Sequence, residues 1–258
     1  MRIVSLCPSL TELAFDLGLG EDLVGITRFC VHPADGVAAI EKVGGTKDPD
    51  VARIVALAPD VVLVNEEENR REDADALEAA GLRIASSFPK TPSETATMVR
   101  DYGAVLEVPE RAEAIARDIE AKSRAVTERA SARGVTRSFL YLIWRKPWMA
   151  CAADTFPSAL LEQAGGKNLL QEGERFPALE AEAIAALEPD LVLLSSEPFP
   201  FAAKHIDELS EATGLPRERF RLVDGEDLSW HGSRTPRGVT YAEEVLWEGP
   251  GAASRPSP

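Results

Sequence analysis

One short pattern occurs twice in this chain: IVALAPDVVLVNEEE at residues 54–68 and IAALEPDLVLLSSEP at residues 184–198. Each copy reads as the apolar end of a helix, then Pro-Asp, then an apolar run and a polar stop. Pro59 and Pro189 end the helices, because proline cannot continue a helix and disfavours helical backbone in the residue before it. The apolar runs are continuous rather than alternating, which is typical of parallel strands buried on both faces. The duplication therefore predicts an α/β protein with two doubly wound lobes.

The polar residues after each strand mark where we expect a ligand. In parallel α/β sheets, ligands gather at the carboxyl ends of the strands. A cleft between two lobes would be the natural place for such a site. Glu66, Glu67 and Glu68 follow the first Pro-Asp strand, and they belong either to this cleft or to a solvated loop.

A long helical stretch separates the two copies. Residues from Pro109 to about Ala132 are rich in Ala, Glu, Arg and Lys, with Ile115, Ile119 and Val126 at helical spacing. At ~1.5 Å per residue this helix would span ~36 Å, which is enough to join two lobes; the alternative is an amphipathic surface helix of one domain. The expected domains are an N-terminal lobe (1–106), a backbone helix (107–134), a C-terminal lobe (135–248) and a disordered tail (249–258).

The charge balance excludes some partners. The formal net charge is −15, from 43 acidic and 28 basic residues, whereas nucleic-acid binding needs a basic surface and anionic lipid attracts cations.

No apolar run is long enough to span a bilayer, and no signal peptide precedes the opening MRIVSLCPS. As written, the sequence predicts a cytoplasmic monomer; if a leader was removed, a periplasmic or lipid-anchored location is expected instead.

Cysteine and histidine suggest a metal at one place. Cys30 and His32 are separated by one residue, and thiolate and imidazole both suit zinc, copper or cobalt. His231 is a candidate third ligand, with Glu67 or Glu68 as an oxygen donor. An axial ligand to the metal of a bound chelate is a variant of this hypothesis. The alternative is a buried thiol in a capped loop.

No catalytic motif stands out. The sequence has no phosphate-binding Gly-x-x-x-x-Gly-Lys loop and no Gly-x-Ser-x-Gly elbow. We therefore expect a binding protein rather than an enzyme. The alternative is an enzyme that uses Cys30 with His32 or His231.

Several motifs resemble the helical-backbone (class III) periplasmic binding proteins of ABC importers. They are RIVSLCPSLTELAFDLG (2–18), GITRFCVHP (25–33), KVGGTKDPDVARIVALAPDVVL (42–63) and SALLEQAGGKNL (158–169). SLCPSLTELAF and GGTKDPD are most similar to the cobalamin-binding type. The resemblance implies two α/β lobes joined by one long helix, a ligand such as cobalamin, haem or a ferric siderophore, and docking on a permease through one surface glutamate per lobe. The positions that match these glutamates are Glu72, beside Arg71, and Glu182.

The resemblance also places ligand-binding residues. The aromatic positions of the cobalamin-type cleft match Phe29, Trp148 and Phe176, and another ligand-facing segment matches Trp230, His231 and Arg234. Aromatic rings stack on flat ligands such as corrins, and Trp144 is a further candidate unless it packs in the core. Arg28, Arg145, Arg234 and Arg237 are candidates to hold a ligand's carboxylates or phosphate, or are solvated surface arginines.

The function predicted from these features is a solute-binding protein that holds a metal chelate between its lobes and delivers it to an ABC importer. No cofactor is required. The alternatives are a cytoplasmic sensor or scavenger of the same ligand class and the Cys/His enzyme.

Near the N-terminus, Ser9 and Glu12 predict a helix-capping box, and residues 224–237 predict a loop before a last helix at 238–247.

Overall fold

The computed structural model describes residues 1–248, so the predicted disordered tail at 249–258 lies outside the described residues. The chain divides into two compact units. The first contains residues 1–89, 93–119 and 231–234, and the second contains residues 90–92, 120–230 and the chain from residue 235 on. A short segment from late in the chain, His231–Arg234, therefore belongs to the first unit.

The first unit is built on a parallel sheet. Its strands are β1 (Ile3–Ser5), β2 (Leu23–Ile26), β3 (Val61–Asn65) and β4 (Ile84–Ser87), in the order β2-β1-β3-β4. The first Pro-Asp unit supplies β3, whose residues are all buried. This confirms the strand that its apolar run predicts.

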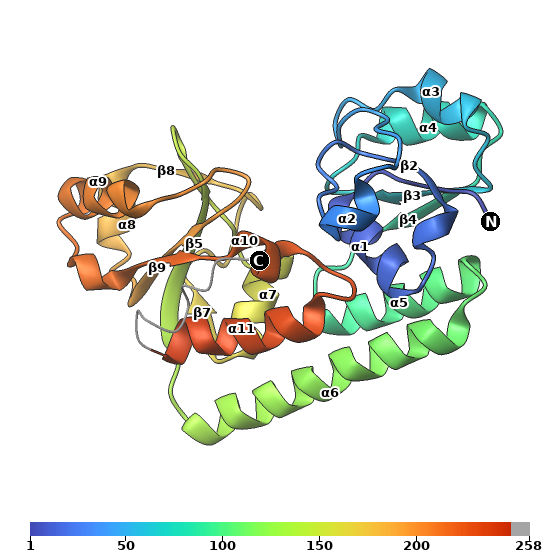
Figure 1. Ribbon diagram of the computed structural model, residues 1–258. Coiled ribbons are helices and arrows are strands. Elements are labelled where there is room, and N and C mark those ends of the chain that lie inside the picture. Colours follow the sequence, from blue (N-terminus) through green and yellow to red (C-terminus); the bar gives the residue numbers. More distant parts are fainter. Residues whose placement is uncertain (249–258) are drawn as a thin grey trace. The chain divides into compact units, whose positions relative to one another are not determined.

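Helices cover both faces of this sheet (Figure 1). On one face, α1 (Pro8–Asp16), α5 (Pro92–Val105) and the first half of α6 (Pro109–Arg133) form a core with Ile3, Val61 and Leu63. On the other face, α3 (Val51–Ala56) and α4 (Arg71–Ala79) pack through Ile54 and Leu77 against Val62 and Val64. The helix α2 (Ala34–Val37) and a 3-10 turn (Gly20–Asp22) complete the unit.

The second unit has a mixed sheet. Its main path is β10 (Phe220–Val223), β9 (Leu191–Ser195), β5 (Arg137–Trp144), β6 (Trp148–Ala150) and β8 (Ala178–Leu179), with β7 (Gly166–Asn168) pairing to β5. The strands β10, β9, β5 and β7 are parallel, whereas β6 pairs antiparallel with β5 and β8. The second Pro-Asp unit supplies β9, which is also fully buried.

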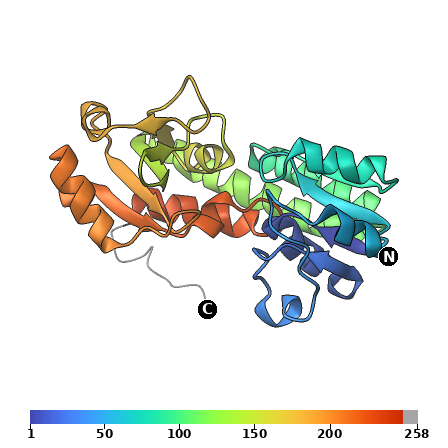
Figure 2. The ribbon, with the colours of Figure 1, turned by 90° about the horizontal axis from the view of Figure 1, so that it is seen from above.

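Helices again lie on both faces of this sheet. One core joins α7 (Phe156–Gln163), α10 (Gly225–Ser229) and α11 (Thr235–Trp247) to Phe139, Tyr141 and Leu193. The other joins α8 (Ala181–Ala186) and α9 (Ala203–Thr213) to Leu140, Leu142 and Val192. Figure 2 shows α9, in orange, and α11, in red, on opposite sides of these strands. A 3-10 turn (Arg217–Arg219) precedes β10.

The long helix α6 is continuous over 25 residues, about 37 Å. Ala112, Ala116 and Ile119 lie in the core of the first unit, and Val126 lies in the core of the second. The division between the units falls inside this helix, after Ile119. The predicted fold, two doubly wound α/β lobes joined by one long helix, is confirmed.

Two local predictions were wrong. Cys7, not Ser9, is the N-cap of α1, and no side chain caps this helix. Proline is favoured in the first helical turn, so Pro8 starts the helix before Ser9 is reached. The predicted loop at 224–237 contains α10, and α11 begins at Thr235 rather than Gly238. Among residues 1–248, no helix combines the length and apolar character needed to cross a membrane.

Candidate functional site

Asn65 organises the carboxyl edge of the first sheet. It is the last residue of β3, and its Oδ1 accepts the backbone N–H groups of Glu67 and Glu68 at 3.0 and 3.1 Å. Its Nδ2 donates to the carbonyl of Ser87, at the end of β4, at 3.1 Å. The same Nδ2 lies 3.0 Å from His231 Nε2. These partners fix the amide orientation, so the nitrogen faces His231.

This orientation defines the state of His231. Because Nδ2 is a donor, Nε2 of His231 must accept and carries no proton. Its other ring nitrogen lies 3.5 Å from Ser9 Oγ. Burial lowers the pKa of His231 to about 4. His231 is therefore a neutral histidine with its Nε2 lone pair already used, not a group that presents that lone pair to a metal.

Arg234 is fixed in the same segment. Its Nε and Nη2 donate to the two carboxylate oxygens of Glu12 at 2.8 and 2.7 Å, and the arginine side chain is only 7% exposed. The sequence suggested Arg234 as a binder of ligand carboxylates, but Glu12 on α1 occupies this bidentate position. Arg234 therefore anchors the 231–234 segment to α1.

The predicted metal site does not assemble. Among the described residues 1–248, no group of three or more His, Cys, Asp or Glu side chains could hold a metal ion. Cys30 is buried, with its sulfur 3.0 Å from Thr11 Oγ1 and 3.2 Å from Thr27 Oγ1. Burial raises the pKa of the Cys30 thiol. Cys30, His32 and His231 thus do not form the expected ligand set, and the buried-thiol alternative holds for Cys30.

Phe29 lies in the loop after β2, at the carboxyl edge of the first sheet. Its side chain is 49% exposed, and the guanidinium of Arg28 lies 4.9 Å from the ring centroid. An exposed ring of this size is available to a flat ligand.

The carboxyl edge of the second sheet carries an aromatic cluster. Trp148, at the start of β6, stacks on Phe201 with centroids 6.2 Å apart. Trp144, at the end of β5, is 41% exposed and meets Phe199 edge-on at 5.9 Å. Phe199 and Phe201 also contact the ring of His205 on α9. Sequence reasoning missed Phe199, Phe201 and His205, although Phe199 and Phe201 directly follow the second Pro-Asp strand.

The other two predicted aromatic residues are less exposed to solvent than Phe29 and Trp144. Phe176 is half-buried against the core of the second unit, with Arg175 at 5.4 Å from its ring centroid. Trp230 is 8% exposed, and its indole N–H donates to Glu197 at 2.7 Å. Trp230 is therefore packed and hydrogen-bonded within the second unit.

The two predicted docking glutamates are exposed. Glu72 lies in the first turn of α4 and Glu182 in the first turn of α8. Both carboxylates are thus near helix N-termini, where negative charge is favourable. Arg71, the alternative match, starts α4 and is 90% exposed at its side chain.

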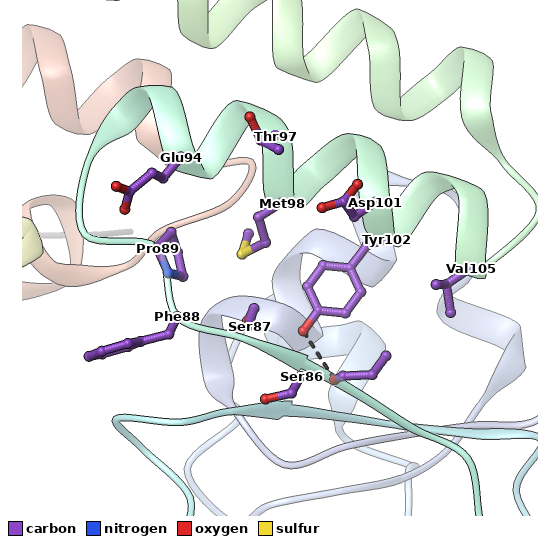
Figure 3. Close-up of a pocket in the computed structure, with 11 residues that line it drawn as sticks. Ser86, Ser87, Phe88, Pro89, Glu94, Thr97, Met98, Asp101, Tyr102 and Val105 are labelled. Atoms are coloured by element: carbon purple, nitrogen blue, oxygen red, sulfur yellow. Dashed lines mark hydrogen bonds between the residues drawn. The ribbon is translucent and has the colours of Figure 1, made fainter.

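A pocket that the sequence did not predict lies between the end of β4 and α5 (Figure 3). Its volume is about 410 Å³. Met98 and Tyr102 reach from α5 toward β4, and the Tyr102 hydroxyl donates to the carbonyl of Ala85 at 3.2 Å. The remaining lining residues are Ser86, Ser87, Phe88, Pro89, Glu94, Thr97, Asp101 and Val105.

Known proteins resemble this chain over nearly its whole length. Residues 3–214 match the family described as periplasmic binding protein. A vitamin B12-binding protein of Vibrio campbellii is 28% identical over 240 residues, which cover 93% of this chain and 86% of that protein.

Solved structures give the same picture of the fold. The periplasmic vitamin B12-binding protein of Vibrio cholerae has a TM-score of 0.82 at 21% identity, covering 95% of this chain and 96% of that chain. A periplasmic haem-binding protein from Pseudomonas aeruginosa also has a TM-score of 0.82, at 25% identity, covering 97% and 93%.

Proposed function

Because the chain belongs to the periplasmic binding protein family, we propose that it carries a metal chelate of the cobalamin, haem or ferric-siderophore class to an ABC importer. The family match at residues 3–214 carries this proposal, since it includes both Pro-Asp units. It confirms the resemblance inferred from the motifs. Its members are binding proteins rather than enzymes, which argues against the Cys/His enzyme.

The aromatic residues at the carboxyl edges of the two sheets are the proposed ligand contacts. Phe29 and Trp144 expose 49% and 41% of their surface, and Trp148 and Phe176 are half-buried beside arginines. A good ring pair contributes about 0.5–1.5 kcal/mol beyond apolar burial. Several such contacts would favour a flat, ring-bearing chelate.

The proposal includes a membrane partner. Glu72 and Glu182, exposed in the first turns of α4 and α8, are the residues proposed to dock on a permease. Delivery to an importer would place the working protein outside the cytoplasmic membrane. The loss of uptake in cells that carry Glu182→Ala, with ligand binding unchanged in the purified protein, would support this role.

A titration tests the ligand class. Purified protein is titrated with cyanocobalamin, haemin and a ferric siderophore, and their absorbance bands and the tryptophan fluorescence are followed. At least one should bind at micromolar concentration or below. Phe29→Ala should weaken that binding about threefold to tenfold, the size of one lost ring contact.

Val135→Ala is a matched control for Phe29→Ala, because Val135 is also an exposed apolar residue, at 59%. It should leave the affinity unchanged. The absence of any spectral change with all three chelates, well above micromolar concentration, would contradict the proposed function.

A further inference from the structure

The pocket between β4 and α5 lies where small side chains face a helix at the edge of the first sheet. β4 is the last strand in the order β2-β1-β3-β4, so no further strand fills the space beside it. Its residues Ala85, Ser86 and Ser87 are small, and the volume left between them and α5 is about 410 Å³. Pockets of roughly 300–1,000 Å³ hold small molecules in proteins. All eleven lining residues belong to the first unit, and none is a proposed contact of the metal chelate.

One side of α5 forms the wall opposite β4. Glu94, Met98, Asp101 and Val105 follow one another at spacings of four, three and four residues, so they share this side of the helix. Met98 and Tyr102 point toward β4 (Figure 3) and are only 6% and 3% exposed. Glu94 and Asp101 are exposed. The pocket therefore has an apolar floor and an acidic rim.

The polar end of Tyr102 is already used by the protein. Its hydroxyl lies 3.2 Å from the carbonyl oxygens of both Val64 and Ala85, and a phenol has a single proton to donate. Tyr102 thus offers a ligand its ring rather than its hydroxyl. The unbranched side chain of Met98 adds an apolar surface that adapts to what it contacts. This floor suits an aliphatic chain.

The rim offers carboxylates at two places along the helix. The lining contains two acids and no lysine, arginine or histidine. The Asp101 carboxylate makes no hydrogen bond or ion pair within residues 1–248. Glu94, in the first turn of α5, precedes Asp101 by seven residues, a rise of ~10.5 Å along the axis. On the strand side, Ser86 donates to a third carboxylate, that of Glu66, at 3.1 Å.

The basic residues that flank the pocket bind acids elsewhere. Lys90 donates to both oxygens of Asp154, at 2.9 and 2.7 Å, and Arg175 lies 3.4 Å from the same carboxylate. Arg100, on α5, donates to Glu113 on α6 at 2.7 Å. None of these bases is among the residues that line the pocket. A ligand ammonium at the rim would therefore contact carboxylates directly.

We propose that this pocket binds a linear aliphatic diamine or polyamine. One ammonium lies at Asp101, the methylene chain crosses Met98 and Tyr102, and a second ammonium lies at Glu94. Ammonium groups donate to carboxylates, and the methylene groups gain free energy by leaving water. The site is separate from the chelate contacts, so it goes beyond the proposed function and does not depend on it.

Three probes with eight-carbon chains test the ligand class. The α,ω-diaminooctane carries an ammonium at each end, octylamine carries one, and suberate carries two carboxylates. Each is titrated calorimetrically into the full chain at one fixed ionic strength, because salt screens exposed charges. The diamine should saturate with a Kd below about 1 mM and bind about twofold to fivefold more tightly than octylamine, the effect of one exposed ion pair. Suberate should not bind.

Methionine methyl signals locate the bound diamine. The chain has three methionines, of which only Met98 lines the pocket. In NMR spectra of protein with isotope-labelled methionine methyl groups, the Met98 signal should shift on titration, whereas those of Met1 and Met149 should not. Met98→Leu identifies the signal. Thr97→Trp places a bulky ring in the pocket and keeps both acids, so it should abolish binding.

Charge variants test the rim. Asp101→Asn and Glu94→Gln should each weaken diamine binding about twofold to fivefold. Glu78→Gln is the matched control, because it removes the same charge from an exposed residue of α4, on the opposite face of the sheet. It should leave the affinity unchanged.

Several outcomes would overturn the proposed diamine site. They are the absence of saturable diamine binding, suberate binding as tightly as the diamine, an unmoved Met98 signal, unchanged binding in Thr97→Trp, and equal effects of Asp101→Asn and Glu78→Gln. The chelate titration with Phe29→Ala uses none of these residues, so its result stands or fails separately.

Discussion

Asn65 Nδ2 lies 3.0 Å from His231 Nε2, across a sequence separation of 166 residues. Because Asn65 Oδ1 accepts from Glu67 and Glu68, the amide cannot turn its oxygen toward the imidazole without losing both bonds. A protonated His231 would place two donors against each other. The contact therefore requires a neutral histidine.

His231 should make stability pH-dependent in mildly acidic solution. Its folded pKa of about 4 lies below the ordinary value of 6.5. The unfolded chain thus takes up the proton first as the pH falls, and stability that is present above pH 6.5 is lost toward pH 4. The loss at pH 4 should be roughly 3 kcal/mol, measured by urea unfolding. His231→Gln, which cannot titrate, should lack this component; an identical pH profile in both proteins would contradict the assignment.

The Glu12–Arg234 pair should contribute far more to the free energy of unfolding than a surface ion pair does. Glu12→Gln removes the bidentate partner of a guanidinium whose side chain is only 7% exposed, and Asp16 remains as a nearby negative charge that acts on Arg234. Breaking a buried pair in this way costs about 3 kcal/mol. Asp207→Asn, in an exposed pair with Arg217, should cost less than about 1 kcal/mol. Equal effects of the two substitutions on urea unfolding would show that Arg234 is not held as described.

The cysteines should be unreactive in the folded protein. Cys7, Cys30 and Cys151 are all buried free thiols, and burial raises the pKa of Cys7 to about 12. Thiolates are the reactive form, so iodoacetamide at pH 8 should modify none of them within minutes, whereas all three should react in denaturant. Mass spectrometry gives the count. Rapid alkylation of Cys30 in the native protein would contradict this prediction and would support a reactive Cys30 thiol.

Much of the fold could be predicted because local pattern and proline position determine it. The continuous runs after Pro59 and Pro189 became β3 and β9, and Pro109 opened α6. Gly18, at φ +74°, directly follows the C-cap Leu17 of the first helix, because glycine adopts that backbone without strain.

The site was harder to predict because its contacts are distant in sequence. Ser9 looked like a cap, but it lies inside α1 and contacts His231 at a separation of 222 residues. From the sequence alone Arg234 was a candidate to bind an anionic ligand, but in the fold it pairs with Glu12. Phe199 and Phe201 were present in the motif SSEPFPF, yet only the geometry shows them meeting Trp144 and Trp148. The aromatic and glutamate roles remain predictions.

Added metal should not stabilise the protein. No group of three or more His, Cys, Asp or Glu side chains among residues 1–248 could hold an ion, and a ligand that binds only the folded state raises its stability by mass action. Zinc or cobalt at about 100 µM, or removal of metals with EDTA, should therefore shift Tm by less than about 1 °C, since a larger shift would need a site with a Kd below about 100 µM. A metal-dependent rise in Tm that disappears in Cys30→Ser would contradict this expectation.

Asn65→Asp should turn His231 into a basic histidine. The carboxylate would retain an oxygen for the N–H groups of Glu67 and Glu68 and place the other toward His231 Nε2. A neighbouring negative charge that accepts the ring proton favours the imidazolium. The His231 pKa, followed by NMR of the imidazole, should therefore rise from about 4 toward or above the ordinary 6.5.

Asn69→Asp is the control for this prediction. Asn69 bonds the backbone of Leu6, Thr46 and Asn65, and no bond joins it to His231 in the described structure. It should reduce stability and leave the His231 pKa low. An unchanged pKa in Asn65→Asp would mean that the Asn65 amide does not set the protonation of His231.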